Sequence, residues 1–186
     1  ARAVPRDLVR IRAIDPAGRE LTSLLAVSAS AGVVAEGNAL FNSARRPRRW
    51  SAPAIACAAL RAVRRHRDFP FRLAHDGREE EVLLSSLSVL KSPWLSGALR
   101  YDLPVEPDDG LFGVAVCAGM GRVRLLATLA GLLFGRFRNR PGTTAFLTTT
   151  LGVSADGPFL LEVDGEVERV VEATFDLLAW RVRVCA

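Results

Sequence analysis

The residues best suited to chemistry lie in the stretch 160–168, which reads Leu-Leu-Glu-Val-Asp-Gly-Glu-Val-Glu. This pattern predicts a strand, a tight turn at Asp164 and Gly165, and a second strand. Asp164 and Glu166 flank the glycine, so a carboxylate at the hairpin tip could take a proton from a reacting group. A purely structural role stays open, because Asp-Gly is a common turn pair that recurs at Asp76-Gly77, Asp109-Gly110 and Asp156-Gly157.

A second acidic turn lies in the middle of the chain. Residues 104–110 read Pro-Val-Glu-Pro-Asp-Asp-Gly and lead into a predicted strand over 111–117. The adjacent carboxylates of Asp108 and Asp109, in a loop restrained by proline, suit a hard divalent cation that prefers oxygen ligands. The alternative is an ordinary turn, because aspartate and glycine are frequent turn residues.

The composition predicts one globular domain over residues 1–186. Of the 186 residues, 49% are hydrophobic, which suffices for one packed core. The three cysteines and two histidines lack the spacing of a zinc site, and three widely separated cysteines fit a reduced, cytoplasmic setting. No segment approaches the roughly 20 apolar residues that a membrane-spanning helix needs, and no signal peptide is visible.

The chain is basic, with a formal net charge of +5. Its basic residues are arginines, with Lys91 as the single lysine. The densest run, Arg45-Arg46-Pro47-Arg48-Arg49-Trp50, could contact an anionic membrane surface or a phosphate, or could be a solvated loop. We expect no nucleic-acid partner, because the charge is scattered and the few aromatic residues form no stacking platform.

Hydrophobic periodicity predicts many antiparallel strands interrupted by helices. We expect about three helices, the first ending near residue 41, the second over 52–66 and the third over 121–134. The predicted fold class is therefore α+β, a mostly antiparallel β-sandwich-like domain with inserted helices. The expected strands cover residues 7–14, 21–28, 69–74, 80–89, 99–103, 111–117, 143–153, 159–163, 167–174 and 179–184.

The predicted helix over 121–134 has two interpretations. Its apolar residues recur at helical spacing and arginines flank it on both sides. The helix could pack on a sheet with this stripe in the core, or it could touch lipid with its basic flanks near the headgroups. The stripe consists of Val123, Leu126, Ala127, Ala130 and Leu133.

In their order and spacing, the motifs resemble the C-terminal domain of the diacylglycerol kinase and sphingosine kinase superfamily, which includes the bacterial YegS-like lipid kinases. The resemblance covers nearly the whole chain. It rests on four segments: Ser30-Ala31-Gly32-Val33-Val34-Ala35, Pro107-Asp108-Asp109-Gly110-Leu111-Phe112, Leu132-Leu133-Phe134-Gly135 and Glu162-Val163-Asp164-Gly165-Glu166.

The resemblance implies a phosphoryl transfer from ATP to a lipid hydroxyl group. In that family the acidic Asp-Gly-Glu stretch takes the proton from the acceptor, so Asp164 is implied as the catalytic base and Glu166 as its partner. The Asp-Asp-Gly turn of the family contributes to a magnesium site, so Asp108 and Asp109 are implied as Mg²⁺ ligands. The family also implies a cleft for acyl chains. These roles suit a reaction that depends mainly on positioning and on charge neutralisation.

The sequence departs from the family pattern in two places. ATP is held in the family largely by an N-terminal domain with a Gly-Gly-Asp-Gly-Thr loop, and this sequence has no such loop. An asparagine and triple-glycine loop before the acidic turn is replaced here by Val89-Leu90-Lys91 and Ser96-Gly97-Ala98. We therefore expect the chain to be the acceptor-binding half of a lipid kinase, inactive without a separate nucleotide-binding domain.

The alternative is a non-catalytic lipid-binding or interaction module of the same fold. In both cases the resemblance implies a cytoplasmic protein, peripheral at the membrane, with a diacylglycerol-like or sphingoid lipid as its ligand. It also makes a homodimer a reasonable expectation.

Overall fold

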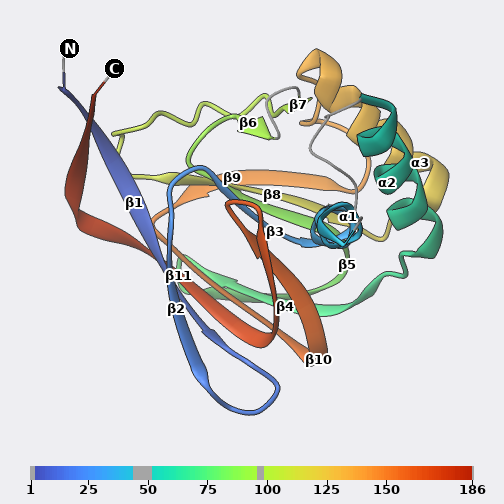
Figure 1. Cartoon of the computed structure of the whole chain (residues 1–186), viewed down its shortest axis with the longest axis horizontal. Helices are drawn as coiled ribbons and strands as arrows, with labels where there is room; N and C mark the ends of the chain where they lie inside the picture. The colour runs from blue at the N-terminus through green and yellow to red at the C-terminus, as the bar shows by residue number, and fades with distance from the viewer. Residues whose placement is uncertain (1–2, 44–51, 96–98, 186) are drawn as a thin grey trace.

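In a computed structural model, the chain folds around one large antiparallel sheet with helices gathered on one side (Figure 1). The structure describes residues 3–43, 52–95 and 99–185. The helices are α1 (Val33–Asn42), α2 (Ala52–Arg65), α3 (Arg122–Gly131) and the short 3-10 helix η1 (Leu132–Phe134). The strands are β1 (Ala3–Ile14), β2 (Glu20–Leu25), β3 (Ser28–Gly32), β4 (Phe69–His75), β5 (Arg78–Leu90), β6 (Trp94–Leu95), β7 (Leu99–Arg100), β8 (Phe112–Ala118), β9 (Thr143–Thr148), β10 (Thr150–Val163) and β11 (Glu166–Cys185).

The large sheet has nine strands, and β6 and β7 form a separate ribbon. The order in the large sheet is β2-β1-β11-β10-β3-β5-β8-β9. Strand β4 pairs with the first halves of β5 and β10, whereas β3 pairs with their second halves. Strands β3 and β4 therefore follow one another in the gap between β5 and β10, and β3 lies beside the end of β10 that leads into the Asp-Gly turn.

The sheet curls over itself to enclose a first apolar core. Residues from strands far apart in the sheet order, such as Ile11 of β1 and Val114 of β8, belong to this one buried cluster. Phe71 of β4 packs edge-on against Phe159 of β10, with ring centroids 5.0 Å apart. The two halves of the curled sheet thus pack face to face around this core, as in a β-sandwich.

A second apolar core lies between the sheet and the three helices. Because side chains alternate along a strand, β8 contributes Val114 and Val116 to the first core and Ala115 and Cys117 to the second. Strand β8 is consequently buried on both faces, and its sequence is a continuous apolar run. The helices supply Val33, Ala62, Val63 and Leu125 to this second core.

The α+β class and the three helices are confirmed by the structure. The expected strand over 143–153 is wrong, because the chain turns at Thr149 between β9 and β10. The two expected strands over 167–174 and 179–184 are one long strand, β11. Asp156-Gly157 is not a hairpin turn but lies in a register shift of β10 opposite β11. A bulge and an uninterrupted long strand both depend on pairing with distant strands.

The predicted core stripe of the third helix is wrong in its orientation. Helix α3 buries Leu125, Thr128 and Gly131, whereas Val123 and Leu126 are exposed. The exposed fraction of Val123 is 85%, and Phe134 of η1 reaches 76%. Both faces of the helix are apolar, so periodicity alone did not identify the face that packs on the protein.

Two segments singled out in the sequence are not among the described residues. The basic run 45–50 and the segment Ser96-Gly97-Ala98 lie outside the described residues. Within residues 3–43, 52–95 and 99–185, no helix is long and apolar enough to cross a membrane.

Candidate functional site

Asp164 occupies the tip of the acidic hairpin, defined here as residues 162–166 between β10 and β11. Asp164 and Gly165 both adopt positive φ angles, of 46° and 99°, which an Asp-Gly pair accommodates in a two-residue turn. The Asp164 carboxylate accepts three backbone N–H groups at the bend between β2 and β3. The donors are Ala26, Val27 and Ser28, at 2.8, 3.0 and 2.9 Å. Asp164 therefore links the acidic hairpin to the bend between β2 and β3.

Glu166 differs from Asp164 in having no hydrogen-bond or ion-pair partner among the described residues. It is also exposed. The turn beneath it is anchored, because the Asn42 side chain of α1 donates a hydrogen bond to the Gly165 carbonyl at 2.8 Å. Of the two predicted catalytic residues, Glu166 is thus the one whose oxygens are open to a substrate hydroxyl group.

Glu162 is a third carboxylate of the acidic hairpin, and it is buried. One carboxylate oxygen accepts a hydrogen bond from the Ser30 hydroxyl at 2.6 Å, and the other accepts the Gly165 N–H at 2.7 Å. Burial raises the pKa of the Glu162 carboxyl, and the negative charge of Asp164 adds to this, while hydrogen bonds from Ser30, Gly165 and Asn38 oppose it. The hairpin therefore holds a buried carboxyl group whose pKa is raised above its ordinary value of 4.5.

The small residues before α1 allow strands to approach closely at this site. Gly32 ends β3 with a φ of 74°, and a Cβ atom there would lie 2.7 Å from the Ser85 carbonyl oxygen of β5. Only glycine fits such a position. The close packing of β3 on β5 also fixes Ser30, which in turn holds Glu162.

Asp109 lies in the acidic loop, defined here as residues 106–111, where it faces a buried lysine. The Lys91 ammonium lies 3.2 Å from the Asp109 carboxylate and 3.4 Å from the Asp7 carboxylate of β1. It also donates hydrogen bonds to the carbonyl oxygens of Glu106 and Leu111, at 3.0 and 2.6 Å. Three oxygen atoms of the loop and one of β1 therefore surround one nitrogen atom.

Asp108 does not take part in this arrangement. It is exposed and makes none of the contacts to Lys91. Asp109 instead accepts the backbone N–H groups of Glu106 and Leu111, both at 3.1 Å. Burial alone would raise the pKa of Asp109, but these N–H groups and Lys91 outweigh it and lower the pKa.

The two predicted acidic sites meet at one residue, Val27, of the bend before β3. The Val27 N–H donates to Asp164, and the Val27 carbonyl accepts the backbone N–H of Lys91 at 2.9 Å. The acidic hairpin and the acidic loop are therefore connected at the same end of the sheet, but they have different charge partners.

The acidic loop has only part of what the predicted magnesium ion requires. Its oxygen atoms are of the right type, since carboxylates and carbonyls are the ligands of hard divalent cations. The space between them contains the Lys91 ammonium, so a metal ion does not fit there while Lys91 keeps this position. Binding of Mg²⁺ by Asp108 and Asp109 stays a prediction that this geometry does not favour.

A pocket of about 260 Å³ opens where β3 ends and α1 begins. Phe69, Pro158 and Phe159 give it an apolar wall, and Glu36 and Arg169 add charged groups. The Glu36 carboxylate contacts the buried His66 ring at 2.9 Å, which holds the glutamate in place. A ligand with an apolar part and a polar group suits such a pocket.

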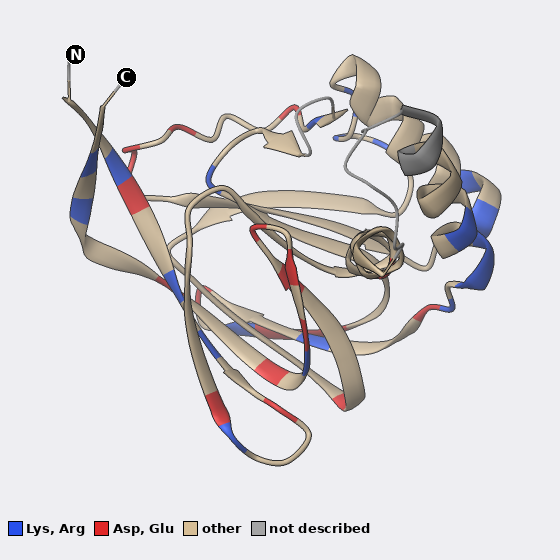
Figure 2. Ribbon diagram, in the orientation of Figure 1, with Lys and Arg blue, Asp and Glu red and all other residues tan. Residues whose placement is uncertain are grey.

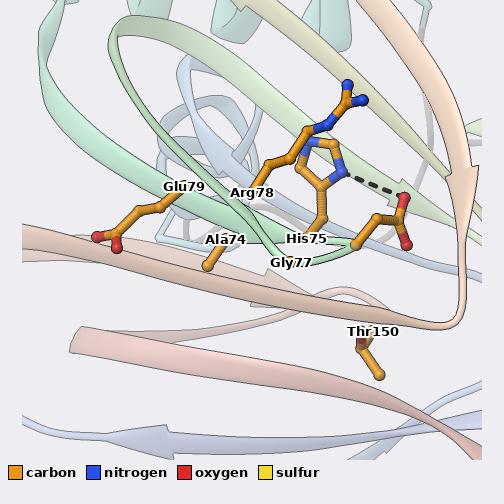
Figure 3. A pocket seen from close by; sticks show the side chains of 7 residues that line it. Ala74, His75, Gly77, Arg78, Glu79 and Thr150 are labelled. Carbon is orange, nitrogen blue, oxygen red and sulfur yellow. Dashed lines mark hydrogen bonds and ion pairs between the residues drawn. The ribbon is translucent and has the colours of Figure 1, made fainter.

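A second pocket, of about 320 Å³, lies at the turn between β4 and β5 (Figure 3). His75 stacks on Phe146 with ring centroids 4.0 Å apart, and its Nδ1 atom lies 3.4 Å from Asp76. None of the predicted catalytic or metal-binding residues lines this pocket. His75 therefore packs at the end of β4, beside the turn that leads into β5.

Sequence reasoning missed Glu162 and Lys91 as members of these sites. Glu162 belongs to an apolar strand, and nothing in its neighbours along the chain reveals the Ser30 hydroxyl that holds it. Lys91 did carry a signal, because it is the only lysine in a chain whose other basic residues are arginines. Its position within the acidic loop depends on β1, β5 and β8 coming together.

Comparison with known proteins places these features in a family. Residues 27–186 match the family model described as the YegS C-terminal NAD kinase beta sandwich-like domain. Among curated proteins, a search finds no match.

Three solved structures from Bacillus anthracis str. Sterne share the fold. Two are described as putative diacylglycerol kinases, with TM-scores of 0.65 and 0.62 and 16% sequence identity each. The third is described as a diacylglycerol kinase, with a TM-score of 0.57 and 12% identity. Each comparison covers 95% of this chain, but only 54%, 55% and 52% of those chains, in that order. The chain thus spans about half the length of these structures.

Proposed function

The chain belongs to the family of YegS C-terminal NAD kinase beta sandwich-like domains, and from this premise we propose that it is the acceptor-binding half of an ATP-dependent lipid kinase. The proposed acceptor is a lipid hydroxyl group of a diacylglycerol-like or sphingoid molecule. Support comes from the diacylglycerol kinase descriptions of the structural relatives and from their greater length, which leaves room for a nucleotide-binding domain. The single observation that carries the proposal is the family match over residues 27–186.

Within this proposal, the acidic hairpin supplies the proton acceptor. Phosphoryl transfer needs a carboxylate near the attacking hydroxyl group, together with exact positioning of the two reactants. Both residues are exposed, but Glu166 has no hydrogen-bond partner among the described residues and can approach a substrate, whereas Asp164 has its oxygen atoms engaged by three N–H groups. We assign the proton acceptor to Glu166 and a positioning role to Asp164, which reverses the order that the family resemblance implies for the pair.

ATP and Mg²⁺ are proposed to arrive with the nucleotide-binding domain. The sequence has no glycine-rich phosphate loop, and the Lys91 ammonium lies among the oxygen atoms of the acidic loop, where a metal ion would lie. Magnesium bound to the ATP phosphates would neutralise their charge during transfer. The residues of this chain would then bind the lipid, orient its hydroxyl group and accept its proton.

The membrane contact is proposed to lie on α3 and η1. Val123, Leu126, Leu133 and Phe134 are exposed apolar side chains on these two elements. Figure 2 shows arginines on α2 and α3, and the exposed ones include Arg61, Arg64, Arg65, Arg122 and Arg124. Helix α2 packs against α3, so basic and apolar side chains share one region. Such a surface suits an anionic lipid interface.

The kinase proposal is tested by measuring phosphate transfer from labelled ATP to diacylglycerol, sphingosine and NAD. The chain alone is compared with the same chain supplied with its nucleotide-binding domain. We expect lipid phosphorylation only when both halves are present. Transfer to NAD alone would contradict the lipid assignment, and lipid binding without any transfer would favour the non-catalytic module.

The catalytic assignment is tested with Glu166→Gln in the complete two-domain enzyme. We expect kcat to fall by about 10² to 10⁴-fold, the usual contribution of a general base, with thermal stability unchanged. Glu168→Gln is the matched control, because it removes a nearby exposed carboxylate of β11 and should keep kcat. Near-normal turnover of Glu166→Gln would remove Glu166 from the mechanism.

The membrane contact is tested by vesicle sedimentation. We expect binding of the chain to phosphatidylglycerol vesicles, weaker binding to phosphatidylcholine vesicles, and loss of binding at high salt. Val123→Ser with Phe134→Ser should reduce binding, whereas Leu83→Ser, which alters an exposed leucine of β5, should not. Equal binding by both variants would contradict the assignment to α3 and η1.

A further inference from the structure

Lys91 is buried, and burying its positive charge is unfavourable unless other groups compensate it. Only 1% of its side chain is exposed, and the Asp7 side chain beside it is 2% exposed. A buried ammonium group needs both a counter-charge and hydrogen-bond acceptors, because it has lost its water. Lys91 has both, since two carboxylates and two carbonyl oxygens lie within 3.4 Å of Nζ.

The oxygen atoms around Lys91 outnumber its hydrogen atoms. An ammonium group has three N–H donors, whereas four oxygen atoms approach the nitrogen. One comes from Asp7 of β1, and three come from the acidic loop, whose last residue, Leu111, precedes β8. A convergent all-oxygen shell of carboxylates and carbonyls is the type of environment that hard divalent cations take.

The charges of this cluster balance without a metal ion. Asp7 and Asp109 contribute two negative charges, and Lys91 contributes one positive charge. The second positive charge comes from Arg181 of β11, whose Nε atom donates to Asp7 at 2.7 Å. A divalent cation added to this neutral cluster would leave an uncompensated charge in a buried place, which is unfavourable.

We propose that the Lys91 ammonium replaces a divalent cation in the acidic loop, so that the loop keeps its shape without metal. Lys91 holds the loop through Glu106, Asp109 and Leu111. Asp7 also holds it directly, because its carboxylate accepts the Gly110 N–H at 2.8 Å and its own N–H donates to the Pro107 carbonyl at 2.8 Å. The inference concerns this chain alone and does not depend on the kinase proposal.

The corollary is that removal of the ammonium opens a cation site. Without Lys91 the cluster has a net charge of −1, and its oxygen atoms have lost their shared donor. Lys91→Ala leaves space for a metal ion with water molecules, whereas Lys91→Met fills the same space with an apolar side chain of similar length. Both variants therefore remove the positive charge, but only Lys91→Ala also creates space for a metal ion.

The first measurement uses the fact that Lys91 is the only lysine. In protein labelled with ¹⁵N-lysine, the Nζ resonance comes from this one group. We expect slow hydrogen exchange of the ammonium and no change of the resonance when millimolar Mg²⁺ or Ca²⁺ is added. A shift of the resonance on adding Mg²⁺, or rapid exchange with solvent in its absence, would overturn the proposal.

The second measurement is the melting temperature in Ca²⁺, in Mg²⁺ and in a chelator. We expect the Lys91→Ala variant to melt at a higher temperature as the cation concentration rises, because a ligand that binds only the folded state stabilises it. The wild type, Lys91→Met and the double variant Lys91→Ala with Asp109→Asn should not respond. A metal-dependent increase in the wild type would contradict the proposal even if Lys91→Ala failed to fold.

Discussion

The acidic hairpin and the acidic loop contain the same dipeptide but stabilise its charge differently. In the hairpin, the Asp164 carboxylate accepts three backbone N–H groups from the bend before β3. In the loop, Asp109 shares the Lys91 ammonium with Asp7 and with two carbonyl oxygens. An Asp-Gly pair thus indicates a turn. The hydrogen-bond or charge partner of its carboxylate depends on which distant segments lie next to the turn in the folded chain.

The two regions also differ in what they leave available. The hairpin fixes Asp164 and buries Glu162, yet it leaves Glu166 exposed. In the loop, Asp109 is paired with Lys91, which also pairs with Asp7 of β1. Asp108 and Glu106 are exposed. Chemistry is therefore expected at the hairpin and structural stabilisation at the loop, and this contrast leads to four predictions.

The largest loss of unfolding free energy is expected for Asp7→Asn, on β1 beside the loop. The substitution keeps the shape of the side chain but leaves buried Lys91 with too little negative charge, and breaking a buried pair costs about 3–5 kcal/mol. Asp176→Asn is the matched control, because Asp176 also pairs with an arginine across β1 and β11, at 2.8 Å, but at a more exposed position. That change should cost less than about 1 kcal/mol. Urea unfolding of both variants measures the difference, and equal losses would remove the special role of the loop.

The next effect is expected for Asp164→Ala at the hairpin. It leaves three backbone N–H groups without their acceptor and replaces a residue with φ of 46° by alanine, so we expect a loss of about 1–3 kcal/mol in unfolding free energy. Glu166→Ala, two residues away, should change stability by less than about 0.5 kcal/mol. A stable Asp164→Ala protein would show that the bend before β3 does not depend on this carboxylate.

A smaller effect is expected in acid at the loop. The pKa of Asp109 is lower in the folded chain than its ordinary value of 3.8, so its carboxylate stabilises the fold above pH 3.8. This stabilisation is lost as the pH falls through the folded pKa, below 3.8. The difference in unfolding free energy between wild type and Asp109→Asn should therefore shrink from pH 6 to pH 3. A difference that is constant over this range would contradict the prediction.

The smallest effect is expected at Glu162 of the hairpin, and its sign is opposite. The pKa of Glu162 is raised above its ordinary value of 4.5, so the stability associated with its protonated form is complete below pH 4.5. It is lost as the pH rises through the folded pKa. Glu162→Gln should gain stability relative to wild type as the pH increases from 4 to 8, measured by thermal unfolding. A relative loss over the same interval would contradict the raised pKa.

Most of the local structure could be predicted from the sequence. The Asp-Gly hairpin, the helices near 33–42, 52–65 and 122–131, and the α+β class follow from turn residues and periodicity, which act over a few neighbours. The order of four short motifs was enough to indicate the family that the match over residues 27–186 supports.

The sequence gives no distinguishing signal where both faces of a helix are apolar, or where strand-favouring residues lie on both sides of a turn. Helix α3 is apolar on both faces, so its sequence did not show that Leu125 would be buried and Val123 exposed. The strand 143–153 was predicted as continuous because threonine and aliphatic residues favour strands on either side of the turn at Thr149.

The sequence by itself determined where the chain turns, which segments are helices or strands, and that acidic groups gather at two turns. Only the tertiary structure decided which of these acids are free. Lys91 lies 84 positions from Asp7 and 18 from Asp109, and Ser30 lies 132 positions from Glu162. Local propensity acts over a few residues, whereas charge and hydrogen-bond partners depend on distance in space, which the curling of the sheet sets.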